Sequence, residues 1–179
     1  MTETTTLPAV APLLDALATR LHAELTAAPE AALLVGIHTG GAWLAAALHR
    51  RLDLPVPLGT LDVSYYRDDL AQGGLRPRQQ PSALPGGVDG KTVWLIDDVL
   101  HTGRTVRAAL NELFDFGRPA RVRLLVLVDR GGHELPIRAD LVGTRVDALP
   151  AQRRVRLHGP DPLHLELGDG RSMRAGDTR

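Results

Sequence analysis

The residue types best suited to chemistry lie together in the middle of the chain. Two adjacent carboxylates, Asp97 and Asp98, directly follow an apolar run from Val93 to Ile96. A continuous apolar run with no polar face is typical of a strand that is buried on both sides in a parallel sheet. We therefore predict a buried strand that ends at these two acids. The alternative is that the acids only cap the helix that follows them.

A short loop of hydroxyl and glycine residues separates the acids from a predicted helix. Amide groups at the start of a helix have no partner inside the helix, so they form a ready site for an anion. Thr102 and Thr105 add hydroxyl donors, Gly103 lets the backbone approach a ligand, and Arg104 adds positive charge. The loop therefore suits a phosphate, and the acids beside it suit hydroxyl groups or a metal. A sugar phosphate has both features, whereas a Walker A loop is excluded because no Gly-Lys-Ser/Thr is present.

The stretch from Val93 to Thr105 resembles the phosphoribosyl pyrophosphate (PRPP) motif of type I phosphoribosyltransferases, an apolar run and two acids before Thr-Gly-x-Thr. Further segments narrow the resemblance to the PyrR family, bifunctional pyrimidine operon regulators with uracil phosphoribosyltransferase activity. These segments are Tyr66–Leu70, Asp97–Ala108, Gly117–Pro119, Val128–Gly131 and Glu134–Asp140. The resemblance, which extends from about Leu33 to about Val142, implies an α/β fold with a mostly parallel central sheet, flanking helices, a small hood and a flexible lid loop.

Length and composition limit the number of domains and the class of protein. With 179 residues and 44% apolar content, we expect one domain over residues 1–179, with polar tails at about 1–6 and 168–179. Cysteine is absent, which excludes thiolate metal sites, and no apolar run approaches about 18 residues, the length needed for a membrane span. A cytoplasmic protein is expected.

The charge pattern leaves RNA binding open. Formal net charge is zero, and Lys91 is the only lysine. Arginines nevertheless cluster at two places in the sequence, and these clusters are either ordinary solvated faces or an RNA-binding patch. The clustered residues are Arg118, Arg121, Arg123, Arg153, Arg154 and Arg156.

A second loop is expected beside the first. An apolar strand at Leu33–Ile37, a loop through Thr39, Gly40 and Gly41, and a helix from Ala42 follow the α/β pattern, in which ligands bind where strands end and helices begin. The resemblance implies that this loop contacts pyrophosphate. Relatives usually carry Thr-Arg-Gly here, so one charged contact is missing, which is worth about 1.5–3 kcal/mol. We expect weaker PRPP binding, and a lower KM for PRPP in Gly40→Arg; alternatively, the glycines only make a tight turn.

The broken segment from Ala71 to Asp89 is a candidate lid. It is longer than ordinary connections and rich in glycine and proline. A lid over the site would keep water from an oxocarbenium-like centre. Arg76 and Arg78 could reach the pyrophosphate when the lid closes, and Arg67, just before the segment, is also assigned to the lid. The alternative is a plain surface excursion.

The strand predicted at Val122–Val128 ends in Asp129 and Arg130, near the hood that the resemblance implies. Arg130 and Val155, the latter in the closing strands of the chain, are the candidates for contact with the base. Relatives commonly read Gly-His-Arg after Asp-Arg, whereas this chain reads Gly131-Gly132-His133. The implied PRPP and nucleotide site as a whole comprises Thr39, Gly40, Gly41, Asp97, Asp98, Val99, Leu100, His101, Thr102, Gly103, Arg104 and Thr105.

The implied reaction joins uracil and PRPP to give UMP and pyrophosphate. Asp97 and Asp98 are the candidate catalytic residues, which hold the ribose hydroxyls and stabilise positive charge on the sugar. Mg²⁺ is expected on the substrate oxygens, without a dedicated protein site. The implied partners are PRPP, uracil, UMP or UTP, pyr leader RNA and further copies of the chain in a homodimer or larger assembly. The alternatives are a nucleotide-sensing RNA-binding regulator with weak or no catalysis, and a salvage enzyme for another base.

Overall fold

The computed structural model describes residues 6–63, 81–146, 149–150 and 152–169. Its centre is a sheet of five parallel strands in the order β2-β1-β3-β4-β5. The strands are β1 (Ala32–Ile37), β2 (Leu58–Leu61), β3 (Thr92–Leu100), β4 (Arg121–Asp129) and β5 (Leu141–Arg145). The order reverses between β1 and β3, and ligands of such sheets bind at the carboxyl ends of the strands where this reversal occurs.

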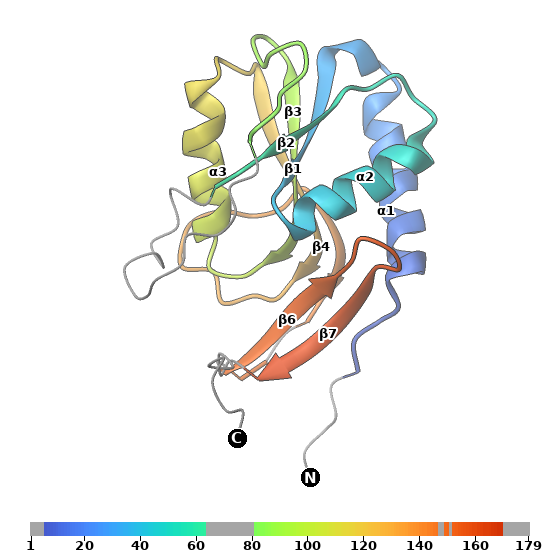
Figure 1. Cartoon of the computed structure of the whole chain (residues 1–179), viewed down its shortest axis with the longest axis vertical. Helices are drawn as coiled ribbons and strands as arrows, with labels where there is room; N and C mark the ends of the chain where they lie inside the picture. The colour runs from blue at the N-terminus through green and yellow to red at the C-terminus, as the bar shows by residue number, and fades with distance from the viewer. Residues whose placement is uncertain (1–5, 64–80, 147–148, 151, 170–179) are drawn as a thin grey trace, which may run out of the picture.

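Helices cover both faces of the sheet (Figure 1). Helices α1 (Val10–Leu25) and α2 (Gly40–Leu52) pack on one face with Trp94 and Ile96 of β3, and α3 (Arg104–Asp115) packs on the other with Val93 and Leu95. Because side chains alternate along a strand, a run that is apolar at every position can fill both layers. The parallel sheet predicted from the sequence is confirmed.

The end of the described chain forms a separate small layer. Strands β6 (Arg153–His158) and β7 (His164–Asp169) pair as an antiparallel hairpin, below the main sheet in Figure 1. Val155 and Leu157 of β6 are buried in the core cluster with α1 and α2. Val155, one of the two residues assigned to the predicted hood, lies in this hairpin, and the hood itself stays a prediction. Strand β7 extends through Gly168 and Asp169, two residues past the approximate start that the sequence predicts for the polar tail.

Part of the predicted lid is packed on the sheet. Thr60 of β2 and Ala83 exchange two backbone hydrogen bonds of 2.8 Å, the Ser82 hydroxyl accepts one from the Asp62 amide, and Val88 is fully buried. Residues 82 and 83 therefore lie along the β2 edge, and the chain that follows is packed in the fold at Val88. The lid prediction for the earlier part of the segment, with Arg67, Arg76 and Arg78, lies outside the described residues.

Two helix predictions also need correction. Helix α2 begins at Gly40, two residues before the predicted start, because the two glycines already have helical geometry. Helical spacing in the sequence predicts that Val106, Ala109, Leu110, Leu113 and Phe114 form one apolar face of α3, yet Phe114, near the C-terminal end of the helix, is 50% exposed. In the described part of the chain, no helix is long and apolar enough to cross a membrane.

Candidate active site

The site begins where β1 and β3 stop pairing. The last paired residues are Gly36 and Ile96, whereas β3 continues alongside β4 as far as Leu100 and Asp129. The prediction that the strand ends at the two acids is therefore wrong, because pairing with β4 carries β3 through them. Residues 97–100 of β3 have a strand neighbour on one side only, and this one-sided end of β3 is the floor of the site.

The first turn of α2 lies directly against this floor. A Cβ atom on Gly41 would be 2.3 Å from the Ile96 carbonyl oxygen, so no other residue fits without moving the backbone. The first amide of α2 with a carbonyl partner inside the helix is that of Trp43, which donates to the Thr39 carbonyl at 3.3 Å. The preceding amides of Gly40 and Gly41 belong to the helix start, where an anion can accept from them.

Asp98 belongs to this α2 side of the site. A Cβ atom on Gly40 would be 2.5 Å from both Cγ and Oδ2 of Asp98, so the carboxylate lies in the space that a side chain at position 40 would occupy. This contact revises the expectation for Gly40→Arg, because the new side chain must first displace Asp98. The partly buried Asp98 carboxylate therefore lies between the α2 start and the sheet edge, within reach of a ligand held at the helix start.

Asp97 differs from its neighbour in environment. It is 5% exposed, and its Oδ1 atom accepts a hydrogen bond of 3.0 Å from the Asp98 amide. Alternation along β3 places Asp97 on the α3 side, with Val93 and Leu95. The two acids thus lie on different sides of one strand, and Asp98 is the more accessible of the two.

The phosphate loop is the turn from Leu100 to Thr105 that leads into α3. Gly103 has φ of +89°, a conformation that non-glycine residues rarely adopt, and is the N-cap of the helix. The first amide with a helical carbonyl partner is that of Arg107, which donates to Gly103 at 2.9 Å. The Arg104 amide contacts the Thr102 hydroxyl at 3.3 Å, and the amides of Thr105 and Val106 have no helical carbonyl partner. The loop therefore presents the amides that the sequence predicts for a phosphate.

Side chains of the phosphate loop have roles that the sequence does not show. Arg104 forms an exposed ion pair with Glu134 at 2.8 Å, so its guanidinium is already held by a carboxylate. His101 bonds through Nδ1 to the Gly131 carbonyl at 2.9 Å. Leu100 is buried in the core, so only its backbone is available at the site, and Val99 is partly buried against the core.

The two candidate base contacts are both buried. Arg130 is 8% exposed, its Nη2 atom donates to the Pro150 carbonyl at 3.2 Å, and its Nε atom has no hydrogen-bond partner among the residues that the structure describes. Burial lowers the pKa of the Arg130 guanidinium, and the neighbouring charge of Arg154 lowers it further. Val155 packs in the core. Both therefore connect the main sheet to the hairpin, and their contact with a base stays a prediction.

One pair of residues was missed in the sequence. His133 donates from Nε2 to Oδ1 of Asp129 at 2.8 Å, and Asp129 is 8% exposed at the end of β4. A spacing of four residues outside a helix gives no sequence signal for such contact, so the pair becomes visible only once the turn after β4 is known. Among the described residues, no group of three or more histidine or acidic side chains is arranged to hold a metal ion.

Comparison with known proteins defines the class. The family model of the phosphoribosyl transferase domain matches residues 2–152. A hypoxanthine phosphoribosyltransferase from Staphylococcus aureus superposes with a TM-score of 0.60 at 21% identity, covering 80% of this chain and 78% of that one. The enzyme of the same name from Trypanosoma cruzi gives 0.60 at 22% identity, covering 77% of each chain. The fold is that of the phosphoribosyltransferases, and the chain belongs to this family.

Closer relatives define the branch. Bifunctional protein PyrR of Pseudomonas aeruginosa (strain LESB58) is 55% identical over 161 residues, which cover 89% of this chain and 94% of the relative. The PyrR protein of Pseudomonas savastanoi pv. phaseolicola is 52% identical over 167 residues, covering 91% and 96%. The chain is a member of the PyrR family, which unites pyrimidine regulation with uracil phosphoribosyltransferase activity, and the resemblance predicted from the sequence is confirmed.

Proposed function

We propose that the chain transfers the phosphoribosyl group of PRPP to uracil, and that the same nucleotide site controls its binding to pyr leader RNA. The enzymatic proposal rests on one observation: the starts of α2 and α3 and the Asp98 carboxylate all lie at the one-sided end of β3. A substrate with a phosphate at one end and a pyrophosphate at the other matches two anion sites separated by an acid.

The proposed roles follow from this arrangement. The phosphate loop binds the 5-phosphate through its amides and hydroxyls, and the amides of Gly40 and Gly41 bind pyrophosphate. Asp98 accepts hydrogen bonds from the ribose hydroxyls and stabilises positive charge on the ring as pyrophosphate leaves. Asp97, which is buried, acts by holding the Asp98 amide. Phosphoribosyltransferases generally use Mg²⁺ with PRPP, and the ion would neutralise the pyrophosphate from the substrate oxygens.

The direct test is magnesium-dependent formation of UMP from PRPP and uracil, with hypoxanthine and orotate as competing bases. Asp98→Asn keeps the size of the side chain and removes its charge. We expect kcat to fall by about 100-fold or more, the usual effect of removing one preorganised electrostatic group. Asp15→Asn, the same change at an exposed acid of α1 that pairs with Arg51, is the matched control. Turnover of Asp98→Asn near that of the control would refute the role of Asp98.

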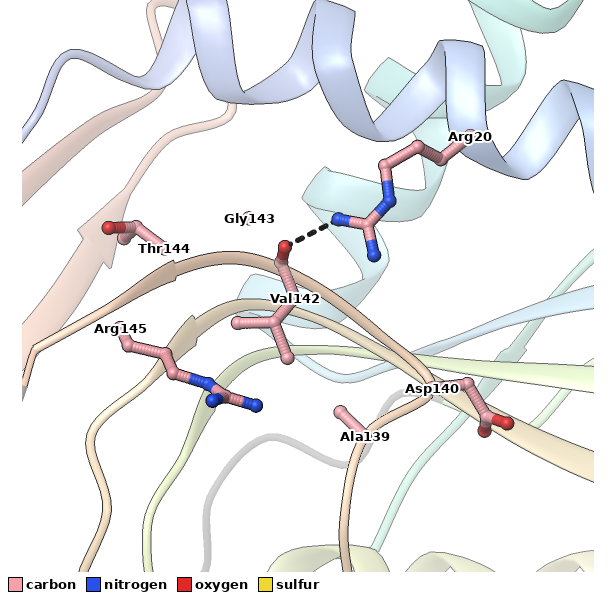
Figure 2. A pocket seen from close by; sticks show the side chains of 7 residues that line it. All are labelled: Arg20, Ala139, Asp140, Val142, Gly143, Thr144 and Arg145. Atoms are coloured by element: carbon pink, nitrogen blue, oxygen red, sulfur yellow. Dashed lines mark hydrogen bonds between the residues drawn. The ribbon is translucent and has the colours of Figure 1, made fainter.

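A pocket at the edge of the sheet favours the RNA-binding half of the proposal. Arg20 of α1 reaches across to β5 and donates to the Val142 carbonyl at 2.9 Å, while Arg145 projects from the far end of the pocket (Figure 2). The pocket has a volume of about 320 Å³. Its one acid, Asp140, is already bonded to Arg123 and to the Leu124 amide. Arg145 lies 3.8 Å from Asp129 Oδ2, but its side chain is 69% exposed and can also reach a phosphate at the surface.

Two of the six arginines in the clusters predicted from the sequence are engaged with other residues. Arg123 bonds to both Glu24 and Asp140 and stacks over Trp94, and Arg153 bonds to Asp169. The other four are exposed, and our proposal of RNA contact at Arg20 and Arg145 rests on the pocket that these two residues line. Arg145→Gln should weaken binding of leader RNA and flatten its salt dependence by about 0.7 in the logarithmic slope for each lost single-strand phosphate contact. Arg118→Gln, in the cluster of Arg118, Arg121 and Arg123, should leave both the affinity for RNA and its salt dependence unchanged. If Arg118→Gln weakens RNA binding and Arg145→Gln does not, the RNA-binding face lies at that cluster instead.

A further inference from the structure

The phosphate loop is held from outside by the segment of residues 130–135, which we call the bracket. The Arg130 amide donates to the Leu100 carbonyl at 2.9 Å. The amides of Glu134 and Leu135 donate to the Thr102 carbonyl at 3.0 and 3.3 Å. Because these bonds attach to the backbone just before Gly103, the shape of the bracket sets the position of the amides that face a phosphate.

The shape of the bracket depends on Asp129. Its Oδ1 atom accepts two hydrogen bonds, from the Gly131 amide at 3.0 Å and from His133 Nε2 at 2.8 Å. Both donors lie within four residues of the acid, so the bonds close a tight turn, which Gly131 and Gly132 permit with φ of +69°. The other oxygen, Oδ2, lies 3.8 Å from Arg145 Nε, so the two short hydrogen bonds to Oδ1 are the ones that hold the turn. A buried carboxylate needs such donors, and losing one would leave Oδ1 poorly compensated.

His101 connects the turn to the phosphate loop. A carbonyl oxygen can only accept, so His101 Nδ1 carries a proton and donates to the Gly131 carbonyl at 2.9 Å. The ring also lies over the turn, because a Cβ atom on Gly132 would be 2.9 Å from its Cε1 atom. A continuous hydrogen-bonded chain therefore runs from His133 through Asp129 and Gly131 to His101.

We propose that His133 is a positioning residue for the substrate phosphate. By donating to Asp129, His133 holds the turn in place, and this turn sets the positions of His101 and of the amides of the phosphate loop. His133 acts through these residues and does not itself bind the phosphate. The inference rests on the proposed function, because it assumes that the loop binds the 5-phosphate of PRPP or UMP. It assigns a chemical role to the position where this chain has histidine in place of the arginine common in its relatives.

The first test separates substrate binding from chemistry. His133→Ala should raise the KM for PRPP by about three- to tenfold, as expected for a small misplacement of a binding group, and leave kcat and the KM for uracil within about twofold. Binding of UMP, measured by calorimetry without turnover, should weaken by a similar factor. His133→Gln can still donate to Asp129 and should restore most of the affinity. A purely structural role would lower the melting temperature without changing these binding values.

A matched control uses another bonded histidine. His49 of α2 bonds from Nε2 to the Val56 carbonyl at 2.8 Å and is partly buried, but it lies at the other end of its helix from Gly40. His49→Ala should lower the melting temperature and leave UMP affinity unchanged. Equal losses of UMP affinity in His49→Ala and His133→Ala would overturn the proposal, because they would reflect general loosening.

A double-mutant cycle tests the chain of contacts. His101→Phe removes the last hydrogen bond of the chain, so His133→Ala should have little further effect on UMP affinity in that background. Additive losses would contradict the proposal, as would a normal UMP affinity in either single variant. If the wild-type protein binds UMP but does not form it, the enzymatic proposal is refuted. The double-mutant cycle, which measures UMP affinity, would still test the role of His133. Absence of both binding and turnover would refute both.

Discussion

The two anion loops of this protein are built in different ways. At the start of α3, the phosphate loop is attached to the bracket by backbone bonds at Leu100 and Thr102 and by the His101 side chain. At the start of α2, the amides of Gly40 and Gly41 are placed by close approach of the helix to β3. The first loop therefore depends on a hydrogen-bonded scaffold, and the second on the absence of side chains. Substitutions should affect them differently, and the predictions below are given from the largest effect to the smallest.

Gly41→Ala should be the most damaging change. The new Cβ atom would be 2.3 Å from a carbonyl oxygen of β3, and backbone on both sides would have to separate. Overpacking of this kind costs about 1–3 kcal/mol. We expect a lower melting temperature together with loss of PRPP-dependent turnover. Gly168→Ala, at a strand position with open space around it, is the control. If Gly41→Ala retained normal stability and turnover, close approach would not be what places the α2 loop.

Gly40→Ala should lower activity while sparing the fold. Here the clash is with the Asp98 carboxylate, a side chain that can rotate away. We expect kcat/KM for PRPP to fall by about 10- to 100-fold, as for a misplaced catalytic group, with little change in melting temperature. The same argument predicts that Gly40→Arg lowers activity, although it restores the charge found in relatives. An improved KM for PRPP in Gly40→Arg would show that Asp98 can be relocated without cost.

Gly103→Ala should have an intermediate effect on the phosphate loop. At φ of +89° a Cβ atom costs about 1–2 kcal/mol, although the nearest side-chain atom, Leu135 Cβ, is 3.4 Å away and leaves room for it. The expected result is a rise of about tenfold in the Kd for UMP, with kcat less affected. Titration of UMP by calorimetry provides the measurement. An unchanged Kd would mean that the bracket holds the loop even when Gly103 is strained.

Arg104→Gln should have the smallest effect. The Arg104 ion pair with Glu134 is exposed on both sides, and such pairs contribute about 0–1 kcal/mol. We expect the KM for PRPP to change by less than about threefold, and the difference to shrink further at high salt. A larger increase in KM would show that Arg104 leaves Glu134 to bind the phosphate, and would make charge more important to this loop than its scaffold.

Much of the architecture was accessible from the sequence. Apolar runs such as Val93–Ile96 predict buried parallel strands because only two-sided burial suits them, and the acids with Thr-Gly-x-Thr predict the phosphate loop. The end of β3 was not predictable, because it depends on pairing with β4, a strand more than twenty residues later. Likewise, the contact of Gly40 with Asp98 joins residues that are far apart in the sequence, and local patterns carry no information about such distances.

Residues of the same type also have different degrees of burial in the structure, which the sequence does not show. Asp97 and Asp98 are identical in type and adjacent, yet one is almost fully enclosed and the other lies against a helix start. Arg104 and Arg130 were both expected to serve ligands, but one is paired with an acid at the surface and the other is enclosed beside the hairpin. Their environments are set by tertiary packing, which composition and spacing do not encode.

Because the pairing of β1 with β3 ends early, lengthening β1 should affect stability and activity differently. Each additional rung between these strands would add stabilising backbone bonds, yet it would also displace the first turn of α2, which lies against Ile96. A variant with β1 lengthened by two residues should therefore lose PRPP-dependent turnover, even where the longer strand pairs. The short β1 is what lets the helix start approach the end of β3.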